Sequence, residues 1–292
     1  RRKHLSGVLP AASPIVAGDT VVVRTHNNLK GLDLRSGKLK WETTVSDALF
    51  REMLKDPQNS DEEFLGTPQT PLQKYLTQRA WQDYTVGYLS SDGKLVFSVE
   101  NVGFIGGFYH FSREDQESVL SPNSYNRLMA FEVATGKFVW ELGGPRLQNP
   151  INYSGHYFLG PPLPLNGKLY ALAEEGREFR LLVLDPQTGK TLWTQSLFRS
   201  EYPIARDYTT DRRPLDHIRR RMGLSPSLAH GVLVCPTGSG CTVGINAVTR
   251  QLLWRNVEPR RNAITSYAAF SRDANENAVG WAEFAPLIVG DR

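Results

Sequence analysis

The hydrophobic residues of this chain occur in short stretches, such as 20–23 and 181–184, separated by polar residues, glycines and prolines. Such stretches suit β-strands and are far shorter than the roughly 18 residues that a membrane-spanning helix needs. One pattern of eleven residues occurs four times, at 31–41, 130–140, 183–193 and 244–254. It begins with a small residue, an apolar residue and Asp, Glu or Asn, continues through Ser/Thr-Gly-Lys and ends in Trp. Val183 takes the small position in the third copy, and Arg250-Gln251 replaces Gly-Lys in the last.

Each copy of the pattern predicts a β-hairpin. An extended stretch leads into a tight Ser-Gly or Thr-Gly turn, where glycine supplies the positive φ, and a second strand ends at the tryptophan. The acidic or amide side chain before the turn can accept backbone N–H groups across it. A further strand pair precedes each hairpin, at 14–23, 88–97, 162–170 and 226–234. The repeating unit is therefore four short strands.

A four-stranded unit of this kind is not stable alone, because both faces and both edges of its sheet are open. Radial stacking covers the faces and leaves only short edges, so the sequence predicts an all-β chain with a β-propeller architecture. We expect residues 1–292 to form a single propeller segment. Its blades are expected at about 11–45, 85–142, 158–198 and 225–257, and residues 286–291, which repeat 14–19, start a further blade at 282–292.

The signature Ala-x-Asp-x-x-Thr-Gly-Lys-x-x-Trp resembles the repeats of the pyrroloquinoline-quinone-type, or quinoprotein-like, propeller family. This resemblance implies that the tryptophan of each repeat docks on the neighbouring blade, and the matching positions are Trp41, Trp140, Trp193 and Trp254. It also implies an exported protein of the periplasm or cell envelope. The family includes quinone-dependent dehydrogenases as well as cofactor-free scaffolds, such as the propeller lipoprotein of outer-membrane barrel assembly, so the fold does not decide the activity.

Four insertions lengthen the predicted propeller, at 46–84, 103–127, 199–224 and 258–281. Capping signals predict helices after Ser46 and after Thr70-Pro71, and the third insertion contains a short predicted helix at 214–222. Because the connections between blades leave a propeller on one face, the insertions that follow Trp41 and Trp193 should share a side. Long loops on a rigid scaffold are where binding usually occurs.

Arginines concentrate in the third insertion, where residues 206–221 hold six arginines and three aspartates. Two interpretations are open: the arginines pair with these aspartates and with neighbouring blades, or they contact an anionic partner. For the second, the candidate partner-binding residues are Arg206, Arg212, Arg213, Arg219 and Arg220. The net charge of the whole chain is +4, from 34 Lys and Arg against 30 Asp and Glu. This excess is too small to indicate a nucleic-acid partner.

Composition narrows the candidate chemistry. With 40% apolar residues the chain can bury a core, and its two cysteines exclude a disulfide-rich scaffold and a four-cysteine zinc site. The six histidines show no His-x-x-x-His spacing, so we predict no metal site. Cys235 and Cys241 flank a predicted hairpin turn at 238–240, where they either form a disulfide or remain two buried free thiols. We expect Glu174 and Glu175 to lie in a solvated loop.

The resembled dehydrogenases place a pair of adjacent cysteines over their quinone, whereas five residues separate Cys235 from Cys241. We therefore predict no cofactor. The preferred function is a non-enzymatic scaffold that binds a protein or another macromolecule through its insertions. The alternatives are a quinone-dependent oxidoreductase of alcohols or sugars, and a sensor propeller attached to another domain. Because the chain lacks an initial Met and a signal peptide and ends in a strand-like segment, we expect a fragment of a longer protein that supplies the remaining blades of a larger ring.

Overall fold

The computed structural model describes residues 12–25, 28–44, 83–100, 125–144, 151–176, 178–199, 222–238, 240–257 and 286. The helices predicted within 46–84 and 214–222 lie outside these residues, apart from Met222, which is not helical. The chain divides into two compact units, residues 1–157 with 187–189, and residues 158–186 with 190–292. Each unit is described by itself. Within the described part of the chain, no helix has the length and hydrophobicity to cross a membrane.

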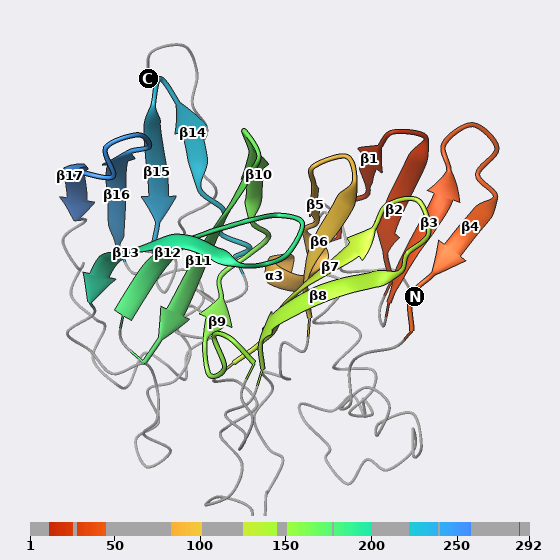
Figure 1. Ribbon diagram of the computed structural model, residues 1–292, viewed down its shortest axis with the longest axis horizontal. Coiled ribbons are helices and arrows are strands. Elements are labelled where there is room, and N and C mark those ends of the chain that lie inside the picture. The colour runs from red at the N-terminus through yellow and green to blue at the C-terminus, as the bar shows by residue number, and fades with distance from the viewer. Residues whose placement is uncertain are drawn as a thin grey trace, which may run out of the picture. The chain divides into compact units, whose positions relative to one another are not determined.

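The first unit contains two antiparallel four-stranded sheets, each with its strands in chain order (Figure 1). The first sheet consists of β1 (Ile15–Ala17), β2 (Thr20–Arg24), β3 (Leu29–Asp33) and β4 (Leu39–Glu42). The second consists of β5 (Ser90–Ser91), β6 (Leu95–Glu100), β7 (Arg127–Glu132) and β8 (Phe138–Gly143). A one-turn helix, α3 (Tyr84–Gly87), precedes β5 and has no counterpart among the predicted elements.

The second unit also contains two antiparallel sheets. The third sheet of the chain consists of β10 (Leu163–Leu165), β11 (Lys168–Glu175), β12 (Glu178–Leu184) and β13 (Thr191–Arg199), with the short strand β9 (Tyr157–Phe158) added beside β11. The fourth consists of β14 (Ser227–Ala229), β15 (Val232–Pro236), β16 (Cys241–Asn246) and β17 (Leu252–Val257). Four antiparallel sheets of four consecutive strands confirm the predicted all-β propeller fold.

The same β-bulge recurs in the outer hairpin of every sheet. The register shifts between Gly31 and Leu32, and the equivalent shift occurs in each of the other three hairpins, at Ala130/Phe131, Val183/Leu184 and Gly244/Ile245. Trp41 is thereby placed opposite Gly31, and Lys40 is the extra residue of its strand. The bulge explains why the residue before the tryptophan varies, since it has no partner across the hairpin.

Side chains of the repeated pattern hold the turn that follows. The Asp33 carboxylate accepts hydrogen bonds from the Ser36 hydroxyl at 2.7 Å and from the Ser36 backbone N–H at 2.7 Å. These bonds, with the hydroxyl of Ser36 contributing most, hold the pKa of Asp33 below its usual value. In the last copy the Asn246 side chain accepts from the backbone N–H groups of Val248 and Thr249 at 2.9 and 2.8 Å. The predicted acceptor role of this position is therefore confirmed in both turns.

The two ends of each sheet differ. At one end, which we call the turn end, short turns join the first strand to the second and the third strand to the fourth. At the other, the insertion end, short turns join β2 to β3, β11 to β12 and β15 to β16, and the chain leaves between β4 and β5, between β6 and β7, between β8 and β10, between β13 and β14, and after β17. All the predicted insertions thus leave their own sheets at the insertion end. The predicted insertion between β6 and β7 is included, although it interrupts a blade rather than following one.

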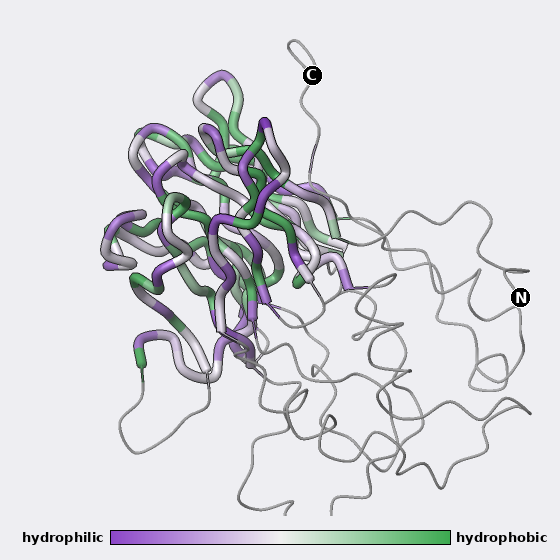
Figure 2. Tube along the Cα trace, turned by 90° about the vertical axis from the view of Figure 1, so that its right-hand side faces the viewer, coloured by the Kyte–Doolittle hydropathy of each residue, from purple (hydrophilic) through white to green (hydrophobic). Residues whose placement is uncertain are grey.

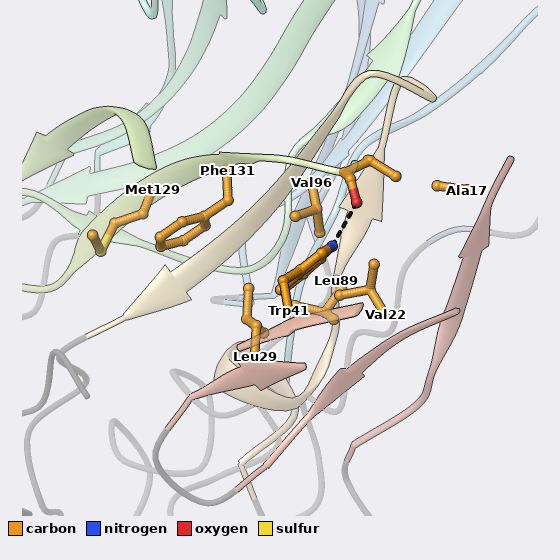
Figure 3. Close-up of a cluster of buried hydrophobic side chains, with 9 residues drawn as sticks. Ala17, Val22, Leu29, Trp41, Leu89, Val96, Met129 and Phe131 are labelled. Atoms are coloured by element: carbon orange, nitrogen blue, oxygen red, sulfur yellow. Dashed lines mark hydrogen bonds between the residues drawn. The ribbon is translucent and has the colours of Figure 1, made fainter. Parts of the chain in front are cut away.

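The second strands of the two sheets in the first unit differ in burial. The central strand β6 is buried along all its residues, while β2 alternates between buried and half-buried ones. The chain trace accordingly alternates between hydrophobic and hydrophilic stretches within the sheets (Figure 2). One core cluster of the first unit combines side chains of both its sheets, among them Leu29, Trp41 and Phe131 (Figure 3). The two sheets are therefore held together by a shared core.

We expect the turn glycine of the second sheet to be needed for space as well as for its backbone conformation. Gly136 and Gly18 both have a positive φ, of 69° and 60°. A Cβ added to Gly136 would lie 2.4 Å from Trp41 Cε3, whereas a Cβ added to Gly18 would have no atom within 4 Å. Gly18→Ala should cost about 1–2 kcal/mol through backbone strain. Gly136→Ala should cost about 1–3 kcal/mol more, through overpacking. Urea unfolding of the two variants measures the difference, and equal losses would contradict the steric role.

Candidate functional site

The predicted docking of Trp41 can be followed atom by atom. Its ring is buried, and its Nε1–H donates a 2.8 Å hydrogen bond to the carbonyl oxygen of Val133, in the turn of the next sheet (Figure 3). On its own sheet the ring lies against Gly31, where a Cβ would be 2.1 Å from Cε2. On the next sheet it lies against Gly136. The ring is thus enclosed between two backbone positions that carry no side chain.

Trp140 occupies the equivalent place in the second sheet. It is buried opposite Ala130, and a Cβ on Gly189 would lie 2.9 Å from its Cδ2. Its ring also stands 5.9 Å from that of Phe97, measured between centroids. Gly189 is the turn glycine of the third copy of the pattern, so the second tryptophan likewise contacts the turn of the following repeat.

The contact changes character at Trp193. Arg250 stands where the other copies have the turn glycine, and it keeps the left-handed backbone with a φ of 65°. Its guanidinium carbon lies 5.1 Å from the centroid of the Trp193 ring, within the range of a cation–π interaction. Trp193 is half-buried. A cation above the ring therefore replaces the close backbone approach that glycine allows.

The fourth tryptophan differs from the expectation of burial. Trp254 is 42% exposed, although its ring lies against Gly244 of its own sheet just as Trp41 lies against Gly31. No repeat that could follow Trp254 is contained in the described residues. Among the described residues, only Gly244 on one side is seen to enclose the ring.

A buried ion pair lies at the insertion end of the first unit. Arg24, the last residue of β2, contacts the Glu100 carboxylate at the end of β6 at 2.7 Å, and both side chains are at least nine-tenths buried. The Arg24 Nε–H donates to the Val86 carbonyl of α3 at 3.1 Å, and the Ser98 hydroxyl donates to Glu100 at 2.8 Å. Asp83 accepts the Val86 N–H and so caps this helix. One arginine thus links both sheets and α3.

Further ion pairs near the insertion end join residues of a single sheet. Arg127 contacts Glu141 at 2.7 Å, and Arg180 contacts Glu178 at 2.7 Å. Glu174 corrects an expectation, since it lies within β11, opposite Phe179, and is buried rather than in a solvated loop. Among the described residues there is no group of three or more His, Cys, Asp or Glu side chains arranged to hold a metal ion.

The two cysteines are buried thiols on neighbouring strands. Cys235 in β15 lies opposite Val243, while Cys241 begins β16, and the predicted turn at 238–240 joins the strands. Thiols rather than a disulfide correspond to one of the two alternatives that the sequence leaves open. Burial raises the pKa of Cys235 to about 12.

The proposed partner-binding arginines, Arg206, Arg212, Arg213, Arg219 and Arg220, lie outside the described residues and stay a prediction. The sequence pattern predicts the docking tryptophans and the turn glycines. It does not predict that the tryptophan of one repeat contacts the turn glycine of the next. It also gives no direct indication of Arg24 and Glu100. The available signal is a charged residue ending an otherwise apolar strand, as Arg24 ends 20–24.

Replacing Trp41 should separate the packing of its ring from its hydrogen bond. Trp41→Ala should lower the free energy of unfolding by about 3–5 kcal/mol, because it empties a buried site between two sheets. Trp41→Phe keeps an aromatic ring but leaves the buried Val133 carbonyl without its donor, so we expect a smaller loss of about 1–3 kcal/mol. Denaturant unfolding followed by circular dichroism measures both. A Trp41→Ala variant as stable as the parent would contradict the docking role.

The thiols should be unreactive until the chain unfolds. Since a raised pKa keeps Cys235 protonated at pH 8, and Cys241 is buried as well, Ellman's reagent should label neither thiol in the native protein and both in 6 M guanidinium. Absorbance at 412 nm gives the count. Rapid labelling of the native protein, or no labelling of the unfolded protein without a reductant, would contradict buried thiols.

The chain shows similarity to proteins of different activities. A curated relative, the tetrathionate hydrolase of Acidianus ambivalens, is 24% identical over 139 residues, which are 44% of this chain and 22% of the hydrolase. The crystal structure of BamB from Moraxella catarrhalis is 13% identical, with a TM-score of 0.47 over 84% of this chain and 52% of BamB. A europium-containing methanol dehydrogenase is 13% identical, with a TM-score of 0.45 over 84% of this chain and 41% of the dehydrogenase. The chain thus spans about a fifth of the hydrolase and about half of BamB.

The family model of PQQ-like repeats, described as outer membrane protein assembly factor BamB, matches residues 1–57 and 82–279 of this chain. These ranges include all four copies of the tryptophan pattern and all four sheets of the structure. The chain therefore belongs to this family of β-propeller proteins.

Proposed function

We propose that this chain is a non-enzymatic part of a β-propeller and serves as a binding scaffold in the cell envelope, contacting a protein partner with its insertions. The observation that carries the proposal is the difference between the two ends of the sheets. The turns that contact the docked tryptophans lie at the turn end, whereas the long insertions leave from the insertion end. Loops supported in this way by rigid sheets are common binding elements.

The ion pair at the insertion end supports a platform role. Arg24 is bound to Glu100 and to the Val86 carbonyl, so its position between the two sheets and α3 is fixed. A buried charge with such partners is costly to expose, because removing one partner leaves the other uncompensated. The strand ends from which the insertions start are therefore held in place.

The third insertion supplies the proposed contact residues. Its arginines, Arg206, Arg212, Arg213, Arg219 and Arg220, favour a partner surface rich in carboxylates, since guanidinium groups bind carboxylates through two parallel hydrogen bonds. Arginine is also enriched among the residues that dominate binding energy. The family description, an outer membrane protein assembly factor, supports a protein partner and a location in the periplasm.

The runner-up function is a pyrroloquinoline-quinone-dependent oxidoreductase, and the described residues do not fit that cofactor. A quinone with several carboxylates needs cations that are free to pair with it, and the buried cation at the insertion end, Arg24, is already paired with Glu100. The two thiols sit on separate strands, with Cys235 opposite Val243, and offer no adjacent pair to cover a quinone ring. These residues therefore favour the scaffold over the oxidoreductase.

Two measurements test the proposal. Affinity capture from an envelope extract should lose its main partner when the five arginines are changed to alanine. It should keep that partner when only Arg206 and Arg212 are changed, each to lysine, so that the charge is retained. Calorimetric titration with pyrroloquinoline quinone and Ca²⁺ should show no binding. A partner retained by the alanine variant would remove the named surface, and micromolar quinone binding would overturn the non-enzymatic assignment.

A further inference from the structure

The outer strand of the fourth sheet carries a tryptophan whose contact is incomplete among the described residues. All six residues of β17 are exposed, and the ring of Trp254 lies against Gly244 of its own sheet. No hydrogen bond joins its Nε1–H to the described residues, whereas the Trp41 Nε1–H donates to the Val133 carbonyl of the next sheet. The described residues thus supply one of the two parts that enclose Trp41.

The chain comes back to the fourth sheet after residues 258–285. The hydroxyl of Ser227, the first residue of β14, donates a hydrogen bond to the carbonyl of Pro286. Pro286 opens the segment 286–291, which repeats 14–19, and 14–19 contain β1 and the turn that follows it. In the first unit, the first strands of the two consecutive sheets, β1 and β5, also contact each other. Pro286 therefore lies where the first strand of a following sheet would begin.

We propose that 286–291 begin a fifth sheet, and that the outer turn of this sheet, formed by the chain after residue 292, covers Trp254. The tryptophan donates its Nε1–H to a backbone carbonyl of that turn, and a turn residue without a side chain in the way lies on its ring. The occupant is inferred from continuity with contacts that the chain already builds. Trp41 and Trp140 each lie against the turn glycine of the repeat that follows them. Repeats of this kind contact their neighbours in the chain.

The spacing within the repeats places the proposed contact in the sequence. In the sheets without an insertion between their second and third strands, the outer-turn residue follows the glycine of the first turn by 19 to 22 residues, as counted from Gly18 and Gly167. Gly290 matches Gly18, so the residue that faces Trp254 is expected 19 to 22 positions after Gly290. The accepting carbonyl belongs to the third residue before it, as Val133 stands before the second turn glycine.

Hydroxyl-radical footprinting of the full-length protein, read by mass spectrometry, tests the proposal. It compares the oxidation of each aromatic side chain in the folded and the unfolded protein. Trp254 should be protected as strongly as the buried Trp41, and Phe138, which is 47% exposed, serves as the unprotected control. Trp254→Ala should speed amide hydrogen exchange in β17 by about 100-fold or more, because the packing of a buried aromatic ring is lost. Trp254→Phe should speed it less, since the ring remains and only the N–H bond is lost.

A change in the proposed turn separates the following repeat from residues 258–285 as the cover of Trp254. Replacing the predicted turn residue by valine should expose Trp254 to oxidation and leave Trp41 protected. Gly18→Ala is the matched control, because a Cβ there meets no atom within 4 Å, and it should leave both tryptophans protected. Protection of Trp254 that survives the valine variant, or oxidation of Trp254 like that of Phe138 in the parent, would overturn the proposal. A full-length sequence without a further copy of the tryptophan pattern at the stated spacing would do the same, whether or not the valine variant folds.

Discussion

The contact between a tryptophan ring and the bare backbone of the next repeat is the interaction on which the rest of the structure depends. Trp41 fits because Gly31 and Gly136 both lack a Cβ that would come within 2.4 Å of its ring. Its Nε1–H then reaches the Val133 carbonyl at 2.8 Å. The small first residue, the turn glycine and the terminal tryptophan of the pattern are therefore parts of one contact, and that contact spans two repeats.

The four copies show how far this contact tolerates change. Where a glycine faces the ring from the next repeat, as at Trp41 and Trp140, the tryptophan is buried. Where Arg250 stands instead, Trp193 is only half-buried, and a guanidinium covers the ring. A left-handed backbone costs a residue with a Cβ about 1–2 kcal/mol, and a cation–π contact returns about 0.5–2 kcal/mol. These terms nearly cancel, which explains why the pattern can lose its glycine there without losing the hairpin.

The strands and turns could be predicted well from the sequence, because their signals are local. Asp33, Ser36 and Gly37 act within one hairpin, and their pattern indicates that hairpin directly. The partner of each group could not be predicted, since the pairing of Arg24 with Glu100 joins residues that lie far apart in the sequence and on different sheets. The two adjacent carboxylates of Glu174 and Glu175 suggest a solvent-exposed loop. Strand β11 nevertheless extends to Glu175, and Glu174 is buried within it. The candidate arginines of the third insertion have no such local pattern to place them.

The docked tryptophans that stabilise the fold and the insertions that can vary in sequence lie at opposite ends of the sheets. At the turn glycines that face a docked ring, Gly136 and Gly189, a single added methyl group is expected to disturb that ring, so these turns admit little change. At the insertion end the backbone is held by polar groups, such as Arg24 with Glu100 and Arg127 with Glu141, which fix the strand ends without specifying the segment between them. Long insertions can then lengthen or change without touching the tryptophan contacts, because they leave from the opposite end of each sheet. A scaffold built in this way can acquire new binding surfaces while its repeats stay the same.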